Sequence, residues 1–217
     1  MRMRSFALLL FCVATASAET LANKAEWQAC AKSNGTACGY CTNGRAGPRT
    51  CLQLDSLGLT GPIPPADLVR MTGLTKLSLG GNCLTGTIPK EIGALTNLIE
   101  LSLSSQLDPR TFQPTLTGPM PREIGLLTKL IHLTLEGNAL TGLIPGEYGS
   151  LTKLTIFDVQ SNLIIGAESG ICGIVGNSWP VPTRCNINSN KAWTNGALCP
   201  ACLNTGSCKP PVACTES

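Results

Sequence analysis

The chain has 217 residues, of which 13% are charged and 4% aromatic, and its formal net charge is +3. Residues 1–18, MRMRSFALLLFCVATASA, have the basic start, short apolar run and small-residue end of a secretory signal. Arg2 and Arg4 supply two of the three excess positive charges, so the chain remaining after cleavage near Glu19 is almost neutral. This charge gives no reason to expect nucleic acid or an anionic membrane surface as a partner. No apolar run reaches the roughly 20 residues that a membrane-spanning helix needs.

Cysteine content indicates the compartment. The chain has twelve cysteines, which is typical of exported proteins with structural disulfide bonds. Cys12 falls within the signal segment and Cys83 stands alone in the middle of the chain. The others form two groups, Cys30, Cys38, Cys41 and Cys51 before it and Cys172, Cys185, Cys199, Cys202, Cys208 and Cys214 after it. Each group is even and can close by disulfide bonds, with Cys83 as the odd thiol. Three pairings are open for the first group and fifteen for the second.

Two Cys-x-x-Cys pairs, Cys38–Cys41 and Cys199–Cys202, have the spacing found in zinc and redox sites. In an exported chain we interpret them as structural bridges, so no metal and no cofactor are expected. Asn34-Gly35-Thr36 is an acceptor sequence for N-glycosylation, and we expect Asn34 to lie on the protein surface.

One pattern recurs through the centre of the chain. The spacing L-x-x-L-x-L-x-x-N-x-L occupies residues 74–84, returns over 130–140, and returns in part over 98–103 and 154–162. Successive starts lie 24, 32 and 24 residues apart, and this period with this spacing marks leucine-rich repeats, in which each coil supplies one short strand. Alternate residues of a strand face opposite sides, so the leucines point inward and stacked coils bury them in one continuous core.

The asparagine after each strand has a predicted structural role. Asn82, Asn138 and Asn162 can donate to and accept from backbone groups at the bend that follows the strand. Leu57 and Gln106 stand where asparagine is expected, so two coils depart from the pattern. Gln106 also lies in an insertion, residues 104–115, which lengthens its coil by eight residues and is expected to project from the solenoid.

The segment L-T-G-x-I-P-x-E-I-G-x-L-T-x-L, seen at 84–98, resembles the plant-type leucine-rich repeat of receptor-kinase ectodomains, small co-receptors and secreted inhibitor proteins. The resemblance implies an α/β solenoid, a right-handed superhelix with a parallel sheet on the concave face, 3-10 or irregular segments on the convex side, and disulfide-capped ends. We expect the chain to divide into a signal peptide (1–18), a cysteine-containing N-terminal cap (19–51), about five leucine-rich coils (52–166) and a cysteine-rich C-terminal cap or tail (167–217).

Residues that alternate with the leucines face solvent on the concave sheet and are not needed in the core, so they are the predicted binding surface. The candidates are Lys76, Glu100, Ser102, His132, Thr134, Glu136, Asp158 and Gln160, with Arg110 and Phe112 of the insertion as further contacts. We therefore expect a secreted, non-catalytic recognition protein of extracellular signalling or defence, acting at the cell surface or cell wall. Its expected ligand is an extracellular protein or peptide, or a carbohydrate.

Three other functions are weighed against this one. An enzyme is disfavoured although Ser102, His132 and Asp158 share a face, because strand rise and spacing put their backbones about 8 Å apart. An inhibitor of a secreted polysaccharide-degrading hydrolase is the alternative within the family. Ice binding is a distant alternative, suggested by a ladder of polar residues whose flatness the insertion would spoil. This ladder consists of Thr60, Thr85, Thr117 and Thr141.

Overall fold

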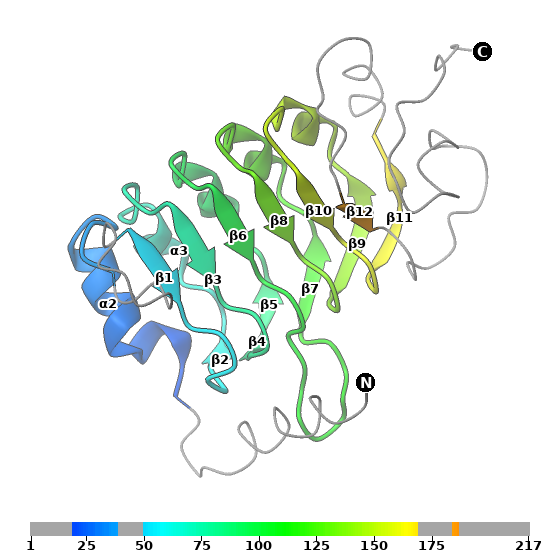
Figure 1. Cartoon of the computed structure of the whole chain (residues 1–217). Helices are drawn as coiled ribbons and strands as arrows, with labels where there is room; N and C mark the ends of the chain where they lie inside the picture. Colours follow the sequence, from blue (N-terminus) through cyan, green and yellow to red (C-terminus); the bar gives the residue numbers. More distant parts are fainter. Residues whose placement is uncertain (1–18, 39–49, 169–183, 187–217) are drawn as a thin grey trace, which may run out of the picture.

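The chain folds as a row of stacked coils whose first strands lie side by side in one parallel sheet (Figure 1). The computed structural model describes residues 19–38, 50–168 and 184–186. The predicted signal peptide, Cys41 and most of the predicted tail, including its cysteine side chains, lie outside these ranges.

Six parallel strands form what we call the concave sheet. In spatial order they are β1 (Cys51–Gln53), β3 (Lys76–Ser78), β6 (Glu100–Ser102), β8 (His132–Thr134), β10 (Ile156–Asp158) and β12 (Arg184–Asn186). The register places Leu52, Leu77, Leu101, Leu133 and Phe157 in one line, which confirms the predicted alignment of the coils. β12 extends this sheet beyond the five predicted strands. The sequence does not predict this strand, because it lies in the predicted tail and lacks the leucine spacing.

A second set of strands lies beside the concave sheet (Figure 1). One pair is β2 (Thr60–Gly61) with β4 (Cys83–Leu84), and a four-stranded parallel sheet contains β5 (Gly86–Thr87), β7 (Leu116–Pro119), β9 (Ala139–Ile144) and β11 (Leu163–Ala167). The sequence predicts only the concave sheet. The Thr-Gly segments pair as well because stacking brings the extended backbone of successive coils within hydrogen-bonding distance.

The convex side is built from short helices, as the resemblance implies. η2 (Lys90–Ala94), η3 (Arg122–Leu126) and η4 (Gly146–Ser150) are 3-10 helices, and α3 (Pro65–Leu68) is their counterpart in the first coil. Each follows a proline with extended backbone, which fixes where the helix begins. The helices approach closely at glycine: a Cβ on Gly125 would lie 2.5 Å from the carbonyl oxygen of Glu147. The glycine of E-I-G therefore sets the distance between coils.

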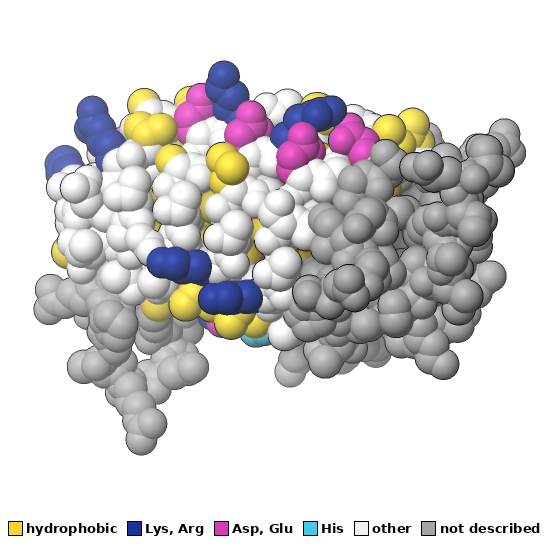
Figure 2. Space-filling view, turned by 90° about the horizontal axis from the view of Figure 1, so that it is seen from above, with side chains coloured by type: hydrophobic (Ala, Val, Ile, Leu, Met, Phe, Trp, Pro, Cys, Tyr) yellow, Lys and Arg dark blue, Asp and Glu magenta, His cyan; other side chains and the backbone are white. Residues whose placement is uncertain are grey.

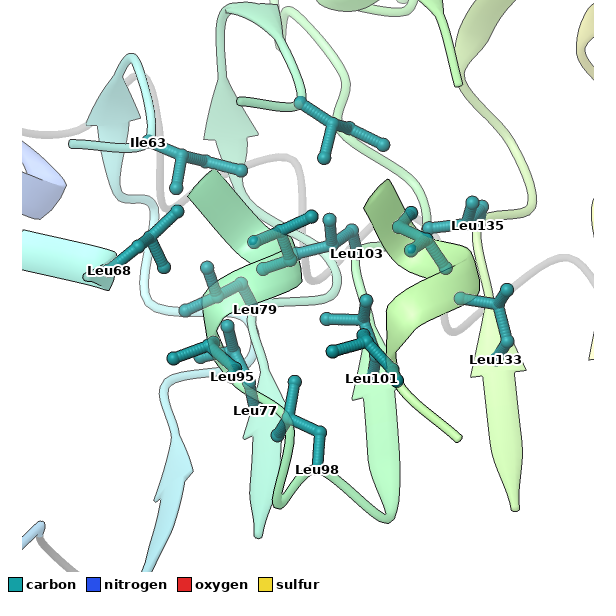
Figure 3. Packing of buried hydrophobic residues seen from close by; sticks show 14 of the residues in the cluster. Ile63, Leu68, Leu77, Leu79, Leu95, Leu98, Leu101, Leu103, Leu133 and Leu135 are labelled. Atoms are coloured by element: carbon teal, nitrogen blue, oxygen red, sulfur yellow. The ribbon is translucent and has the colours of Figure 1, made fainter. Parts of the chain in front are cut away.

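Leucines from the strands and from the convex side fill the space between these layers (Figure 3). Leu77, Leu101 and Leu133 of the concave strands are at most 1% exposed, and Leu95 and Leu98 of the convex turn are fully buried. Burying one such side chain stabilises the fold by about 1.5–3 kcal/mol, so the stacked leucines are the main source of stability. The predicted continuous core is confirmed.

A ladder of buried amide side chains, which we call the amide ladder, runs along the ends of the concave strands. Its members are Asn82, Gln106, Asn138 and Asn162, each at most 3% exposed. Successive members share a backbone acceptor. The shared carbonyl oxygens are those of Leu79, Leu103 and Leu135, each of which accepts hydrogen bonds from two neighbouring amides. The ladder thus joins four coils through one continuous hydrogen-bond network.

Gln106 performs the role predicted for asparagine. Its side-chain nitrogen donates to the carbonyl of Leu79 at 2.8 Å, and its side-chain oxygen accepts from the backbone N–H of Leu84 at 3.1 Å. The longer side chain reaches these groups from the start of the insertion. Leu57 is the other position that lacks the expected asparagine. Its backbone N–H donates to Asn82 Oδ1 of the next coil at 3.0 Å.

The N-terminal end is closed by η1 (Leu21–Asn23) and α2 (Ala25–Lys32). Trp27 of α2 is fully buried, and its indole N–H donates to the carboxylate of Asp67 at 2.8 Å. Because Asp67 belongs to α3, this bond fastens the cap to the first coil.

Disulfide bonds reinforce this end of the molecule. Cys30 is bonded to Cys38, one of the pairings that the sequence left open. Cys51 and Cys83 each take part in a disulfide bond as well. The prediction that Cys83 is an odd thiol is therefore wrong, because a count of cysteines by position does not show which of them meet in space.

Tyr148 replaces the isoleucine of E-I-G and brings a buried hydroxyl into the core. The hydroxyl donates to the carbonyl of Pro121 at 3.0 Å, and the side chain is 2% exposed. Burial, with the charges of Glu123 and Glu147 nearby, raises the pKa of the Tyr148 phenol well above its ordinary value. The unfolded chain ionises this phenol above about pH 10 while the folded chain keeps it neutral, so stability falls as the pH rises through that range.

We expect Tyr148→Phe to lower the free energy of unfolding at neutral pH by about 1–2 kcal/mol, because the Pro121 carbonyl loses its donor. Between about pH 9 and pH 11 the variant should lose less stability than the parent protein, since it has no phenol here to ionise. Urea unfolding at both pH values, followed by circular dichroism, measures this difference. Equal losses in the two proteins would contradict the expectation.

Candidate functional site

The solvent-facing residues of the concave sheet lie in three rows that cross the strands. Row one is Lys76, Glu100, His132 and Ile156, row two is Gln53, Ser78, Ser102, Thr134 and Asp158, and row three is Asp55, Gly80, Ser104, Glu136 and Gln160. All eight predicted concave residues lie in these rows, and all eight are half-buried. The sheet therefore brings together the predicted site residues, whose role in binding stays a prediction.

An open hollow of about 190 Å³ lies over the centre of the sheet. Lys76, Glu100, His132 and Ile156 line it from row one, and Ser78, Ser102 and Thr134 from row two. The Glu100 carboxylate lies between two of these side chains: it is 2.5 Å from Lys76 Nζ and 3.7 Å from His132 Nδ1. The hollow thus has a charged wall on row one and a hydroxyl-bearing wall on row two.

Row three is acidic and is held by neutral donors. Asp55 accepts from the Ser78 hydroxyl at 2.6 Å and from the Gly80 N–H at 2.7 Å. Glu136 accepts from the side-chain amide of Gln160 at 2.6 Å. Asp55 and Ser78 are not among the site residues predicted from the sequence. The bond between them explains why Ser78 is only 8% exposed although it faces the concave side.

Comparisons with known proteins bear on this architecture. A family model described as Leucine Rich Repeat matches residues 73–95. The leucine-rich repeat ectodomain of the plant membrane receptor kinase GASSHO1/SCHENGEN3 from Arabidopsis thaliana was solved in complex with CASPARIAN STRIP INTEGRITY FACTOR 2. It is 36% identical to this chain with a TM-score of 0.51, over 58% of this chain and 14% of that ectodomain. This chain therefore spans only a small part of that receptor's length.

Two further structures are similar over more of their length. Pollen Receptor Kinase 3 is 25% identical with a TM-score of 0.52, over 71% of this chain and 65% of that chain. The BIR2 ectodomain from Arabidopsis thaliana is 30% identical with a TM-score of 0.52, over 65% of this chain and 67% of that chain. This chain belongs to the plant-type leucine-rich repeat family. No curated protein matches this leucine-rich repeat protein in sequence.

The insertion of this leucine-rich repeat protein is a hairpin that projects between β6 and β7 (Figure 1). Leu107 and Pro114 form an antiparallel bridge, and the Asp108 carboxylate accepts from the N–H groups of Arg110 and Thr111 at 2.7 and 3.1 Å. These backbone bonds lower the pKa of Asp108. Phe112 sits at the turn with a positive φ of 58° and is 57% exposed. Internal hydrogen bonds therefore hold the aromatic ring outward in a backbone conformation that bulky residues rarely adopt.

The threonines of the expected ladder are out of register in the second sheet. Thr117 pairs with Thr87 instead of Thr85, and Thr141 pairs with Pro119 instead of Thr117. In the backbone pairing, the threonine of each coil is thus displaced by two residues from the threonine of the coil before it. An alignment of the coils by repeat position does not reveal this displacement. This stagger argues against a flat array that could match an ice lattice.

The convex side of the leucine-rich repeat protein has a balanced charge. Arg122 pairs with Glu147 at 2.9 Å and with Glu168 at 2.8 Å. Seen from above, basic and acidic side chains lie together along this border of the molecule (Figure 2). Ion pairs on the described part of the convex side therefore link neighbouring coils, and they leave no electrostatic field of one sign there.

The remaining sequence features concern glycosylation, membrane spans and metal binding. Asn34 is exposed in a turn with a φ of 53°, and its glycosylation stays a prediction. Within the described ranges, no helix is long and apolar enough to cross a membrane. The same ranges contain no group of three side chains that could hold a metal ion.

Proposed function

We propose that this leucine-rich repeat protein is a secreted, non-catalytic recognition protein that binds a protein or peptide on its concave sheet. The main support is the set of solvent-facing rows around an open hollow, because these side chains have no role in the core. The GASSHO1/SCHENGEN3 ectodomain, solved with a bound factor, is a relative with the same architecture. The proposal includes the division into signal peptide (1–18), cap (19–51), repeats (52–166) and tail (167–217).

The surroundings of the histidine favour binding over catalysis. A general base needs a nucleophile within hydrogen-bonding reach. His132, the one histidine of the chain, lies beside the Glu100 carboxylate, which is already held by Lys76. The Glu100 carboxylate can help to position a ligand, but it is not a hydroxyl nucleophile that His132 could activate.

The insertion hairpin is a second contact element in this proposal. Arginine and phenylalanine, the residue types of Arg110 and Phe112, are enriched at protein interfaces, and arginine is also enriched among the residues that contribute most of the binding energy. Their backbone is already ordered by the Asp108 bonds, so binding loses little conformational entropy there.

The proposal is tested by capture from extracellular fluid with the immobilised full chain, followed by identification of the retained molecules. We then expect charge reversal at Glu136 and Asp158 to weaken binding of the retained partner at least about tenfold, because opposite charges across an interface become like charges. Surface plasmon resonance measures the dissociation constants.

Charge reversal of Glu26 and Glu91, which lie on α2 and on convex η2, is the matched control and should leave binding unchanged. If the concave reversals leave binding unchanged, the site lies elsewhere on the molecule. If the retained partner is a polysaccharide-degrading hydrolase, an activity assay of the mixture shows whether binding inhibits it.

A further inference from the structure

We propose that the ligand of the concave sheet is an extended, basic polypeptide segment with two lysine or arginine side chains about four residues apart. This inference rests on the proposed function and names the chemistry of its ligand. Three features support it: the charge of the concave rows, the way the carboxylates are held, and the spacing between them.

The concave rows have a charge opposite to that of the whole chain. On strands β1 to β10 they contain Asp55, Glu100, Glu136 and Asp158 against one cationic residue, Lys76, and the register continues row one to Arg184 on β12. The whole chain has 16 Lys and Arg against 13 Asp and Glu. The acidic character of this face is therefore local, and it selects for a cationic partner.

The carboxylates of Asp55 and Glu136 are positioned by neutral donors, which orient them without cancelling their charge. Asp55 is held by a hydroxyl and a backbone N–H, and Glu136 by an amide. A carboxylate has about four acceptor positions, so an arginine or lysine of a ligand can still bind these oxygens. Glu100 differs, because Lys76 already pairs with it.

The spacing of the carboxylates fits an extended chain that crosses the strands. Asp55 and Glu136 both lie in row three and are separated by three strand intervals, from β1 through β3 and β6 to β8. Three intervals measure about 14 Å, and an extended polypeptide covers this distance in about four residues. Residues i and i+4 of such a segment point to the same side, so both cations can face the sheet. The hollow lies over rows one and two of β3, β6 and β8, beside the row-three path between these two carboxylates.

The experiment is a selection from a library of random linear nine-residue peptides on the immobilised full chain, secreted by a host cell. We expect the retained peptides to be enriched in Lys and Arg at least about threefold over the input, with pairs at i and i+4 over-represented, and to be depleted in Asp and Glu. Retention should fall at least about tenfold between low and high salt, because salt screens exposed charges.

Matched variants separate the face from the overall charge. Glu136→Gln with Asp55→Asn removes two concave charges without changing side-chain size and should abolish the basic enrichment. Glu26→Gln with Glu91→Gln removes the same number of charges away from the face and should preserve it. Circular dichroism confirms that both variants are folded.

The possible outcomes distinguish this inference from the proposed function. Retained peptides that are neutral or acidic overturn the basic-ligand inference but leave peptide recognition standing. Equal loss of enrichment in both double variants assigns the attraction to net charge and also overturns the inference. If no peptide is retained, or if only soluble oligosaccharides bind, peptide recognition on this sheet is itself wrong.

Discussion

Replacing Asn138 with alanine is expected to lower the free energy of unfolding by about 3 kcal/mol. Asn138 is 1% exposed, donates to the carbonyls of Leu103 and Leu135 at 3.0 and 2.9 Å, and accepts from the Gln106 N–H at 3.1 Å. Alanine makes none of these bonds, so buried backbone groups of two coils lose a partner. Urea unfolding followed by circular dichroism gives the difference in stability.

Asn97→Ala is the control for this measurement. Asn97 also bonds through its amide, to the carbonyl of Thr72 at 2.8 Å and to Lys129 at 2.7 Å, but these bonds are exposed to solvent. Water replaces such bonds, so its loss should stay below about 1 kcal/mol. Similar losses at Asn138 and Asn97 would show that the amide ladder is not a special source of stability.

The second large effect is expected for Gly125→Ala, which should destabilise the protein by about 3 kcal/mol through overpacking. An added Cβ would lie 2.5 Å from the carbonyl oxygen and 2.8 Å from the Cβ of Glu147. Part of this contact is backbone, which cannot rotate away, so η3 and η4 must move apart. Thermal and urea unfolding of the variant measure the effect.

Gly86→Ala separates overpacking from backbone strain. Gly86 has a φ of 81°, but a Cβ there meets nothing within 4 Å. Alanine at this site should therefore lose only the about 1–2 kcal/mol of an unfavourable left-handed conformation. A loss at Gly86 as large as that at Gly125 would mean that the distance between coils is not set by the convex glycines.

Most of the scaffold can be predicted from the repeat, because the leucine spacing specifies both the strand and its buried side. The concave rows follow from that spacing, and so does the placement of Glu100, His132 and Asp158 on one face. The second sheet is harder to predict, because it depends on backbone pairing between coils and on a register shift that no residue type marks.

The side-chain contacts within the candidate site cannot be predicted from the leucine spacing. Sequence position does not show that Glu100 lies between Lys76 and His132, or that the Ser78 hydroxyl turns toward Asp55. These choices depend on side-chain conformations across neighbouring strands. The disulfide state of Cys83 was missed for the same reason, since only the folded chain shows which sulfur atoms meet.

Gln106 closes the coil that carries the insertion hairpin. Its side chain completes the amide ladder at the point where the hairpin leaves, and the Thr115 N–H donates back to the Gln106 carbonyl at 2.8 Å where the hairpin returns. The solenoid is therefore closed beneath the hairpin, and residues 107–114 are attached to it as an exchangeable module. We therefore expect that loops of other lengths and sequences can be grafted between these two anchor points while the coils below keep their stacking.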